Sequence, residues 1–269
     1  MKAFKRVLVL TLIVFVTYSC NKNPITGRKG LNLIPESQLV AMSLTSYSQF
    51  LNENPPVASN NSDAQMVKNT GARIATAVLQ YMKQEGLSKK VKGYKWEFNL
   101  VNDDQANAWA MPGGKVVVYS GILKHTQDER GLAFVLGHEI AHAIARHGNE
   151  RMSQMLLAQT GSLALDVAMV NKPAETRAMY QTAYGATTQL GVLLPFSREH
   201  ESEADKMGLV FMAMAGYDPR GIGEFWSRME AAHPNETPNF LRTHPTNEKR
   251  IKAINDYMPT ALKYYKPRQ

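Results

Sequence analysis

The stretch that most constrains the fold of this chain is H-E-I-A-H at residues 138–142, inside an apolar run. On an α-helix, with about 100° per residue, His138 and His142 lie about 40° apart and one turn from each other. Two imidazoles in this arrangement can each direct one nitrogen at a single Zn²⁺, and Glu139 would lie beside the open position of the metal. Acidic residues before the run and Arg146-His147-Gly148 after it predict the two ends of this helix. Such a motif also arises by chance, so the prediction depends on a third ligand elsewhere in the chain.

A second helix is predicted over residues 196–216, and it carries several acidic residues. Glu201 and Asp205 are four residues apart and therefore lie on one face of that helix. A zinc site of the His₂Glu type needs one carboxylate ligand, and a second acid can hold a ligating imidazole in place. The residues themselves leave Glu199 and Glu203 as equally eligible ligands, and acids at such spacing are also common on solvated helix faces.

Residues 1–20 have the features of an export signal rather than of a folded segment. A basic start precedes a largely apolar run from Val7 to Val16, which is too short to cross a bilayer because a spanning helix needs about 20 residues. The segment ends at Cys20, the only cysteine in the chain. A small residue followed by this cysteine resembles a bacterial lipobox, in which the cysteine is lipidated after cleavage; an ordinary secretory signal is the alternative. With a single cysteine, the exported chain has no internal disulfide and depends on packing for its stability.

Charge and composition exclude one class of function and set the size of the fold. Loss of the signal leaves 28 Lys and Arg residues against 23 Asp and Glu residues, a net charge of +5 that is spread along the chain. Because the sequence has no basic run and no basic patch interleaved with aromatic residues, we expect no nucleic-acid site. The remaining residues suffice for one well-buried domain. We therefore expect a tether over residues 21–35 and a single domain over residues 36–269.

Residues 107–121 predict a strand, a turn at Pro112-Gly113-Gly114 and a second, β-branched strand that leads into the H-E-I-A-H helix. We expect one strand to be an open sheet edge beside the metal, where an extended substrate can pair through main-chain hydrogen bonds. The candidate edge is Asn107-Ala108-Trp109-Ala110, and the alternative is an ordinary hairpin of the fold. Further helices are expected over residues 35–51, 63–85, 152–169 and 178–194, the last two as a soluble or membrane-surface pair. The expected fold class is α+β and mostly helical, with a small sheet beside the helix that carries the motif.

Four further motifs accompany H-E-I-A-H in a characteristic order. They are N-P-I-T-G-R at 23–28, N-A-W-A-M-P-G-G at 107–114, S-R-E-H-E-S-E-A-D-K-M-G at 197–208 and T-H-P-T-N-E-K-R at 243–250. With these motifs the chain resembles the gluzincin metallopeptidases of the CAAX prenyl protease and HtpX type, and most closely their soluble periplasmic lipoprotein branch. The resemblance implies a zincin-like domain with one Zn²⁺ per chain on His138, His142 and Glu201, with Glu139 as general base and Asp205 behind a ligand. It also implies that residues 107–119 border the substrate groove.

The resemblance further implies a zinc endopeptidase of the bacterial cell envelope. We expect an outer-membrane lipoprotein that faces the periplasm, is held to the membrane through lipid on Cys20, and degrades misfolded or unassembled envelope proteins. The alternative is a chaperone-like binding protein that keeps the zinc fold and cleaves little; Glu139 favours the enzyme, because metal binding alone does not require it. Arg198, Arg242 and His244 are candidate donors to the oxyanion of the reaction, and the sequence leaves that choice open. His244 is expected in the active site, either as a latch on the fourth zinc position or as that donor.

Overall fold

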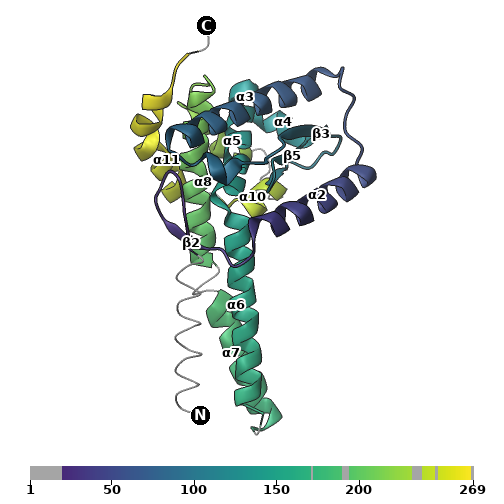
Figure 1. Ribbon diagram of the computed structural model, residues 1–269, viewed down its shortest axis with the longest axis vertical. Helices are drawn as coiled ribbons and strands as arrows, with labels where there is room; N and C mark the ends of the chain where they lie inside the picture. Colours follow the sequence, from purple (N-terminus) through teal and green to yellow (C-terminus); the bar gives the residue numbers. More distant parts are fainter. Residues whose placement is uncertain (1–19, 171, 190–193, 232–237, 246–247, 268–269) are drawn as a thin grey trace. The chain divides into compact units, whose positions relative to one another are not determined.

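We describe a computed structural model of the chain, which covers residues 20–170, 172–189, 194–231, 238–245 and 248–267 (Figure 1). The chain divides into two compact units, and each is described by itself. The first unit comprises Met1–Pro35 and Arg146–His200, and the second comprises Glu36–Ala145 and Glu201–Gln269. Residues 1–19, which form most of the predicted export signal, lie outside the described residues.

The second unit contains a three-stranded sheet with the strand order β3-β5-β4. The central strand β5 (Lys115–Tyr119) pairs in parallel with β3 (Glu97–Val101) and antiparallel with β4 (Ala108–Met111). Gly113 and Gly114 connect β4 to β5 with φ angles of 89° and 90°, in the left-handed region that favours glycine. The predicted strand, turn and strand are therefore confirmed, and β4 is an edge of this sheet in the part of the chain that the structure describes.

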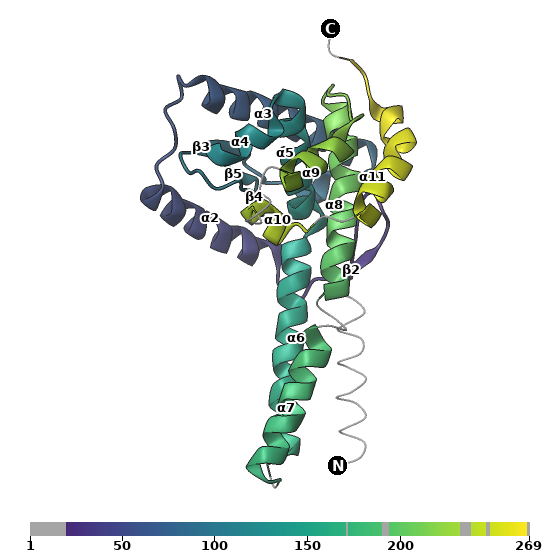
Figure 2. The ribbon, with the colours of Figure 1, turned by 180° about the vertical axis from the view of Figure 1, so that it is seen from behind.

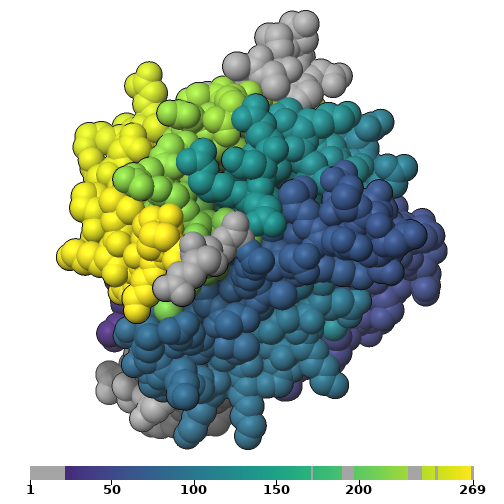
Figure 3. Space-filling view, turned by 90° about the horizontal axis from the view of Figure 1, so that it is seen from above, coloured from purple at the N-terminus to yellow at the C-terminus, as the bar shows by residue number. Residues whose placement is uncertain are grey.

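Helices make up most of the second unit, which confirms the expected fold class. In chain order they are α2 (Glu36–Glu53), α3 (Ser62–Gln84), the 3-10 helix η1 (Ser88–Val91), α4 (Ser120–Thr126), α5 (Glu129–Ala145), the later part of α8 (Leu194–Met214), α9 (Ile222–Ala231), α10 (Asn239–Thr243), α11 (Glu248–Ala261) and the 3-10 helix η3 (Leu262–Tyr264). The 3-10 helix η3 packs beside α3, where the rings of Tyr81 and Tyr264 lie 6.1 Å apart, and Figure 3 shows the yellow C-terminal region next to the blue of α3. Tyr81 also contacts Phe211 of α8 at 5.9 Å between ring centroids, so these helices share one core.

The helix that carries H-E-I-A-H, α5, is buried along almost its whole length. It approaches α8 closely at two glycines. A Cβ added to Gly137 would lie 3.0 Å from the carbonyl oxygen of Gly208, and a Cβ added to Gly208 would lie 3.0 Å from the backbone nitrogen of His138. Larger residues would push the two backbones apart, so these glycines let the histidines of α5 face the acids of α8.

Two helix ends differ from the sequence-based expectation. The sequence favours Asp63 as the N-cap of α3, but the cap is Asn61. The Asn61 side chain accepts hydrogen bonds from the backbone nitrogens of Asp63 and Ala64, so Asp63 lies in the first turn. Helix α5 ends at Ala145 because Arg146 adopts a left-handed φ of 62°. The predicted stop, Gly148, instead lies inside the next helix.

The first unit contains the antiparallel hairpin of β1 (Cys20–Lys22) and β2 (Lys29–Leu31), helices α6 (His147–Ala168) and α7 (Ala174–Thr188), and the start of α8. The segment over 21–35, for which the sequence predicts a tether, makes hydrogen bonds to α6. Arg28 donates two of them to the Glu150 carboxylate at 2.8 and 2.7 Å, and the backbone nitrogen of Leu33 donates to Ser153 at 2.9 Å. Within the described ranges, no helix combines the length and apolar character that a membrane crossing requires.

Candidate metal centre

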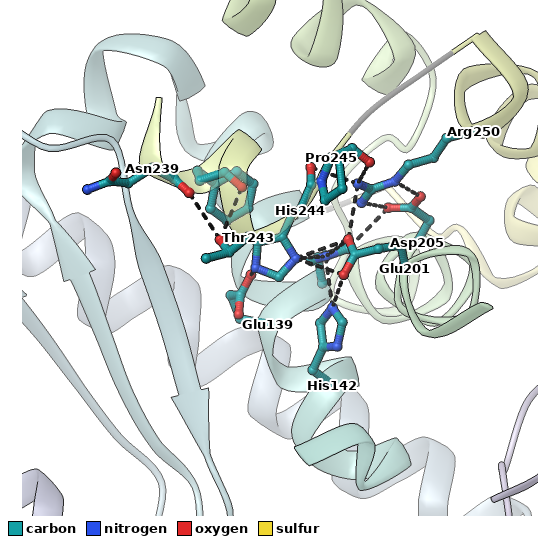
Figure 4. A network of polar contacts seen from close by, with 11 residues as sticks. Glu139, His142, Glu201, Asp205, Asn239, Thr243, His244, Pro245 and Arg250 are labelled. Carbon is teal, nitrogen blue, oxygen red and sulfur yellow. Dashed lines mark hydrogen bonds and ion pairs between the residues drawn. The ribbon is translucent and has the colours of Figure 1, made fainter. Parts of the chain in front are cut away.

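Four side chains of the second unit direct ligand atoms at one point. His138, His142, Glu201 and His244 each offer one nitrogen or oxygen, and these atoms all lie within 4.8 Å of one another (Figure 4). The Nε2 atoms of His138 and His142 are 3.1 Å apart, and each lies 3.4 Å from an oxygen of Glu201. The Nδ1 atom of His244 lies 3.2 Å from His138 Nε2 and 3.0 Å from both Glu201 oxygens. We call these four residues the ligand cluster.

The separations within the ligand cluster fit a tetrahedral zinc ion. Ligand atoms bound at about 2.0–2.1 Å to a tetrahedral Zn²⁺ lie about 3.3 Å from one another. The distances between donor atoms given above range from 3.0 to 3.4 Å and agree with that spacing. Imidazole nitrogens and a carboxylate oxygen are also the ligand types that zinc accepts. The site therefore fits zinc, as H-E-I-A-H predicts.

Helices α5 and α8 supply the three ligands that the sequence predicts. His138 is fully buried, whereas the side chains of His142 and Glu201 are 18% and 10% exposed, so the cluster is buried without being sealed from solvent. Of the rival acids on α8, Glu199 is 57% exposed and Glu203 is buried outside the cluster. Glu201 is thus the acid that the fold brings to the two histidines.

A second layer of charged residues lies behind the ligands. Asp205 Oδ1 is 3.0 Å from Nδ1 of His138, the ring nitrogen that does not face the cluster. Arg250 of α11 donates from Nε and Nη2 to the Asp205 carboxylate at 2.6 and 2.8 Å, and its Nη1 lies 3.0 Å from Glu201 Oε2. The guanidinium itself lies 4.1 Å from the centre of the Trp226 ring. One arginine therefore holds both the ligand carboxylate and the acid that orients a ligand imidazole.

The carboxylates of the site favour a positive charge between them. Burial alone would lower the pKa of His138, but hydrogen bonds with Asp205 and Glu201 raise it to about 9. Burial opposes the charged form of both acids as well, yet the neighbouring histidines hold the pKa of Glu201 well below its usual range, and Arg250 lowers the pKa of Asp205. A site that stabilises an imidazolium this strongly also stabilises a bound metal cation.

Glu139 lies beside the ligand cluster on α5. Its side chain is buried, and burial raises its pKa. Its Oε1 atom lies 3.3 Å from Nε2 of His244, and among the described residues that oxygen has no hydrogen bond of good geometry. A buried carboxylate with a raised pKa and an available oxygen is suited to accept a proton from a water molecule.

His244 is the predicted loop residue that the structure brings into the cluster. It follows α10, whose backbone is tied to the segment before β4 by a hydrogen bond from Phe240 N to Ala106 O at 2.9 Å. Its two ring nitrogens face different partners, Nδ1 the ligands and Nε2 the carboxylate of Glu139. Of the other candidate oxyanion donors, Arg198 and Arg242 are both exposed.

The candidate substrate edge, residues 107–110, lies on and just before β4. The backbone nitrogen of Tyr119 donates a hydrogen bond to the carbonyl of Asn107. In an antiparallel pair every second residue faces the partner strand, so the backbone groups of Asn107 and Trp109 point toward β5. Those of Ala108 and Ala110 point away from it. Ala108 N is bonded to the side chain of Asn107, which leaves Ala110 with outward-facing backbone groups. The Trp109 ring packs on Phe50 of α2 at 5.0 Å between centroids.

The sequence reasoning missed Arg250 and Trp226 as parts of the site. A signal for Arg250 was present: it shares one face of α11 with the buried residues Ile254 and Ala261, at helical spacing. A charged residue on the apolar face of a helix needs a buried partner, which here is Asp205. We find no comparable signal for Trp226, because a tryptophan on a buried helix face is ordinary core.

Comparisons with known proteins agree with this geometry. The model of peptidase family M48 matches residues 68–258. The chain is 38% identical over 169 residues to the mitochondrial metalloendopeptidase OMA1 of Schizosaccharomyces pombe, covering 62% of this chain and 48% of that protein. It is 30% identical over 263 residues to the mitochondrial metalloendopeptidase OMA1 of Homo sapiens (94% and 49%), and 32% identical over 163 residues to the beta-barrel assembly-enhancing protease of Escherichia coli (58% and 33%). The chain thus spans half or less of the length of these relatives. Because the family's match covers most of the chain and includes the ligand-bearing parts of α5 and α8, this protein belongs to peptidase family M48.

Proposed function

We propose that this protein is a zinc endopeptidase in which His138, His142 and Glu201 hold one Zn²⁺ per chain. The observation that carries the proposal is the convergence of their donor atoms, at tetrahedral spacing, next to the buried carboxylate of Glu139. The human relative named as a metalloendopeptidase supports it, since its match covers 94% of this chain.

Glu139 is the general base and acid of the proposed reaction. Zinc bound in the cluster would polarise the scissile carbonyl and lower the pKa of a water toward about 7. Glu139 would take a proton from the attacking water, whose oxygen adds to the scissile carbonyl carbon, and would give that proton to the amine nitrogen as the C–N bond breaks. Asp205 keeps the proton of His138 on Nδ1, so that Nε2 stays available as a ligand. Arg250 holds both acids in place throughout.

His244 acts as a latch on this site. Its Nδ1 occupies the fourth corner of the cluster, where a catalytic zinc site keeps its open position, and its Nε2 covers Glu139. Opening then requires His244 to move away from the cluster, and the hydrogen bond between Phe240 and Ala106 connects the preceding helix α10 to the residue before the substrate edge. The other form of the hypothesis makes His244 a donor to the oxyanion after it has left the metal position.

The substrates are extended segments of misfolded or unassembled envelope proteins. Ala110 offers backbone groups that face away from β5, so a substrate strand can add to the sheet with little dependence on its side chains. One relative, from Escherichia coli, is named as a beta-barrel assembly-enhancing protease, which supports an envelope substrate class. The mitochondrial relatives show that the same family also acts in another compartment.

The location we propose is the periplasmic face of the outer membrane, with lipid on Cys20. The basic and apolar residues before Cys20 support export. That the only cysteine of the chain lies at the end of this signal supports a lipobox. Cys20→Ala should lower the fraction of the protein that is bound to the membrane or leave its signal uncleaved. Finding the unaltered protein fully soluble after cell fractionation would end the lipoprotein proposal.

A chaperone-like binding protein is the second candidate. The observation that favours it is the four-residue cluster itself, because zinc sites closed by four protein ligands are commonly structural. In that case zinc content and binding of unfolded protein would be normal, while cleavage would be absent. Glu139 argues against it, since a closed structural site has no need of a buried carboxylate beside the metal.

One assay separates the two candidates. The assay measures the rate of casein cleavage by the zinc-loaded protein and by its Glu139→Gln variant. The control is Glu199→Gln, which makes the same change at an exposed acid. We expect Glu139→Gln to lose a factor of about 10² to 10⁴ in rate with zinc content unchanged, and Glu199→Gln to cleave normally. If the unaltered protein and Glu139→Gln are equally inert on several unfolded substrates, the binding protein is the better description.

A further inference from the structure

The hairpin of α6 and α7 in the first unit exposes an unusual amount of apolar surface. Of the eleven exposed large apolar side chains in the described part of the chain, eight lie between Met155 and Tyr180. Leu163, Val167 and Met179 are 61%, 75% and 62% exposed. Helix α7 has no buried residue, and the buried residues of α6 all lie at or before Gln154. An exposed apolar surface of this extent marks a site of interaction.

The hydrogen bonds between the two helices join polar groups, and their close approach is at a glycine. Ser162 and Gln181 exchange two hydrogen bonds at 3.0 Å, and the Tyr184 hydroxyl donates to the carbonyl of Ala158 at 3.1 Å. Gly161 leaves no room for a Cβ, because the Tyr184 hydroxyl occupies that space. Figures 1 and 2 show α6 and α7 side by side from opposite directions. The hairpin therefore has hydrogen-bonded polar groups between its helices and large apolar side chains on the outside.

This arrangement is the reverse of what water favours. A helical hairpin in water buries its apolar residues between the helices and exposes its polar ones. Small residues and hydrogen bonds between helices, with apolar side chains outside, are typical of helices that pack in an apolar medium. The hairpin thus has the polarity of a segment that is in contact with hydrocarbon.

The apolar residues also extend around the hairpin instead of forming one stripe. Leu156, Leu163 and Val167 share one face of α6 at helical spacing, while Met155 and Leu157 point about 100° to either side of it. A second copy of the chain, or the groove of a partner protein, would cover one face. A fluid layer of acyl chains can adapt to side chains over a wider arc than a rigid protein groove, so the distribution favours a membrane over a protein partner.

We propose that the α6–α7 hairpin lies in the surface of a lipid membrane, with its outer apolar side chains among the acyl chains. It is immersed along its side and does not cross. Between residues 152 and 189 the chain has only four charged residues. Two of them, Asp166 and Arg177, face each other at 3.6 Å, as charges near hydrocarbon are expected to do.

The other two charges set the orientation. Lys172 and Glu175 lie where α6 passes into α7, at the end of the hairpin. Driving that end into hydrocarbon would strip water from both charges, whereas a hairpin that lies along the surface keeps them among the lipid headgroups. This membrane contact is separate from any lipid on Cys20 and does not depend on the proteolytic activity of the second unit.

The test places a polarity-sensitive fluorophore on single cysteines in the full chain, with Cys20→Ala as background. Leu163→Cys and Met179→Cys report on the hairpin, and Leu79→Cys is the control, because Leu79 is an exposed leucine of α3 outside the hairpin. The protein is mixed with vesicles of phosphatidylethanolamine and phosphatidylglycerol. At both hairpin positions we expect a blue shift of the emission and quenching by a quencher embedded in the bilayer. At the control position we expect neither effect.

Charge variants provide the second arm. Leu163→Glu combined with Val167→Glu should weaken vesicle binding by about tenfold or more, whereas Leu44→Glu combined with Leu79→Glu adds the same charge at exposed leucines elsewhere and should not. Circular dichroism shows whether each variant folds. Unshifted fluorescence at both hairpin positions in vesicle-bound protein would overturn the proposal. So would a blue shift that occurs without vesicles and grows with protein concentration, since that result assigns the surface to a second copy of the chain.

Discussion

Arg250 places its Nη1 atom 3.0 Å from Oε2 of Glu201, the only carboxylate in the ligand cluster. The same guanidinium is fixed on its other edge by two hydrogen bonds to Asp205 and on its face by Trp226. Since it is buried, it has few other positions to adopt. The ligand carboxylate is therefore aimed at the cluster by a group on a helix that itself carries no ligand.

Replacement of Arg250 should lower the affinity of the site for zinc, because the arginine positions a ligand and takes no part in the reaction itself. A lysine cannot make the two parallel hydrogen bonds to Asp205 and reach Glu201 as well, so Arg250→Lys should weaken zinc affinity by about 10 to 100-fold. Competition with a chromophoric chelator measures this directly. Lys249→Ala, a change at the exposed neighbouring residue, is the control. Unchanged zinc affinity in Arg250→Lys would show that the arginine does not position the ligand.

The histidine ligands could be read from the sequence, and the acidic ligand could be narrowed to one helix, because each pair of residues lies on one helix. His138 and His142 are one turn apart on α5, and Glu201 and Asp205 are one turn apart on α8, so local periodicity fixes their mutual geometry. What the sequence could not provide is the contact of Arg250 with Asp205, which joins residues 45 positions apart. The choice among three acids on α8 likewise came from the family resemblance and not from the residues.

In the sheet, too, the local features could be predicted from the sequence and the contacts between distant segments could not. The turn between β4 and β5 is local and was predicted, because two glycines in succession permit the left-handed backbone there. Which of the two strands forms the edge depends on β3, which pairs with β5 in parallel from a distance along the chain. Val117 thus lies in the central strand, fully buried, and a proline there would disrupt the sheet instead of testing the substrate edge.

Ala110 is the position at which to test substrate pairing. Its backbone N–H faces away from β5, so Ala110→Pro removes an outward donor without breaking a hydrogen bond to β5. We expect turnover of an unfolded protein to fall by about tenfold, with zinc content preserved. Ala110→Val, which keeps the N–H, should cleave normally. Normal turnover by the proline variant, with full zinc and normal folding, would exclude this edge as a binding strand.

Glu150 should make the first unit sensitive to acid. Burial would raise the pKa of its carboxyl, but hydrogen bonds from Arg28 and His200 lower it to about 2. A carboxyl whose pKa is lower in the folded protein stabilises the folded state at pH values above its ordinary pKa near 4.5. This contribution is lost as the pH falls toward 2. A shift of this size corresponds to about 3 kcal/mol at neutral pH.

Hydrogen exchange of β2 and α6 against pH measures this contribution. Glu150→Gln should reduce protection of these amides at neutral pH, and its difference from the unaltered protein should shrink between pH 4.5 and pH 2. Glu175→Gln, at an exposed acid on α7, should follow the unaltered protein throughout. A difference for Glu150→Gln that stays constant down to pH 2 would mean that the loss is one of packing and not of charge.

His244→Ala distinguishes the two roles proposed for this residue. In the structure, Nδ1 of His244 lies at ligand spacing from His138 and Glu201, which is the arrangement that a latch requires. The alanine variant keeps three ligands and frees the fourth position, so we expect faster basal cleavage of casein with zinc content unchanged. Cobalt substitution gives an independent readout, because the visible spectrum of Co²⁺ changes when a nitrogen ligand is lost. A fall in turnover of roughly a hundredfold would instead assign His244 to the oxyanion, and Arg242→Ala is the comparison for that role. If His244→Ala changes neither the turnover nor the cobalt spectrum, the residue is neither a latch nor a donor and does not bind the metal.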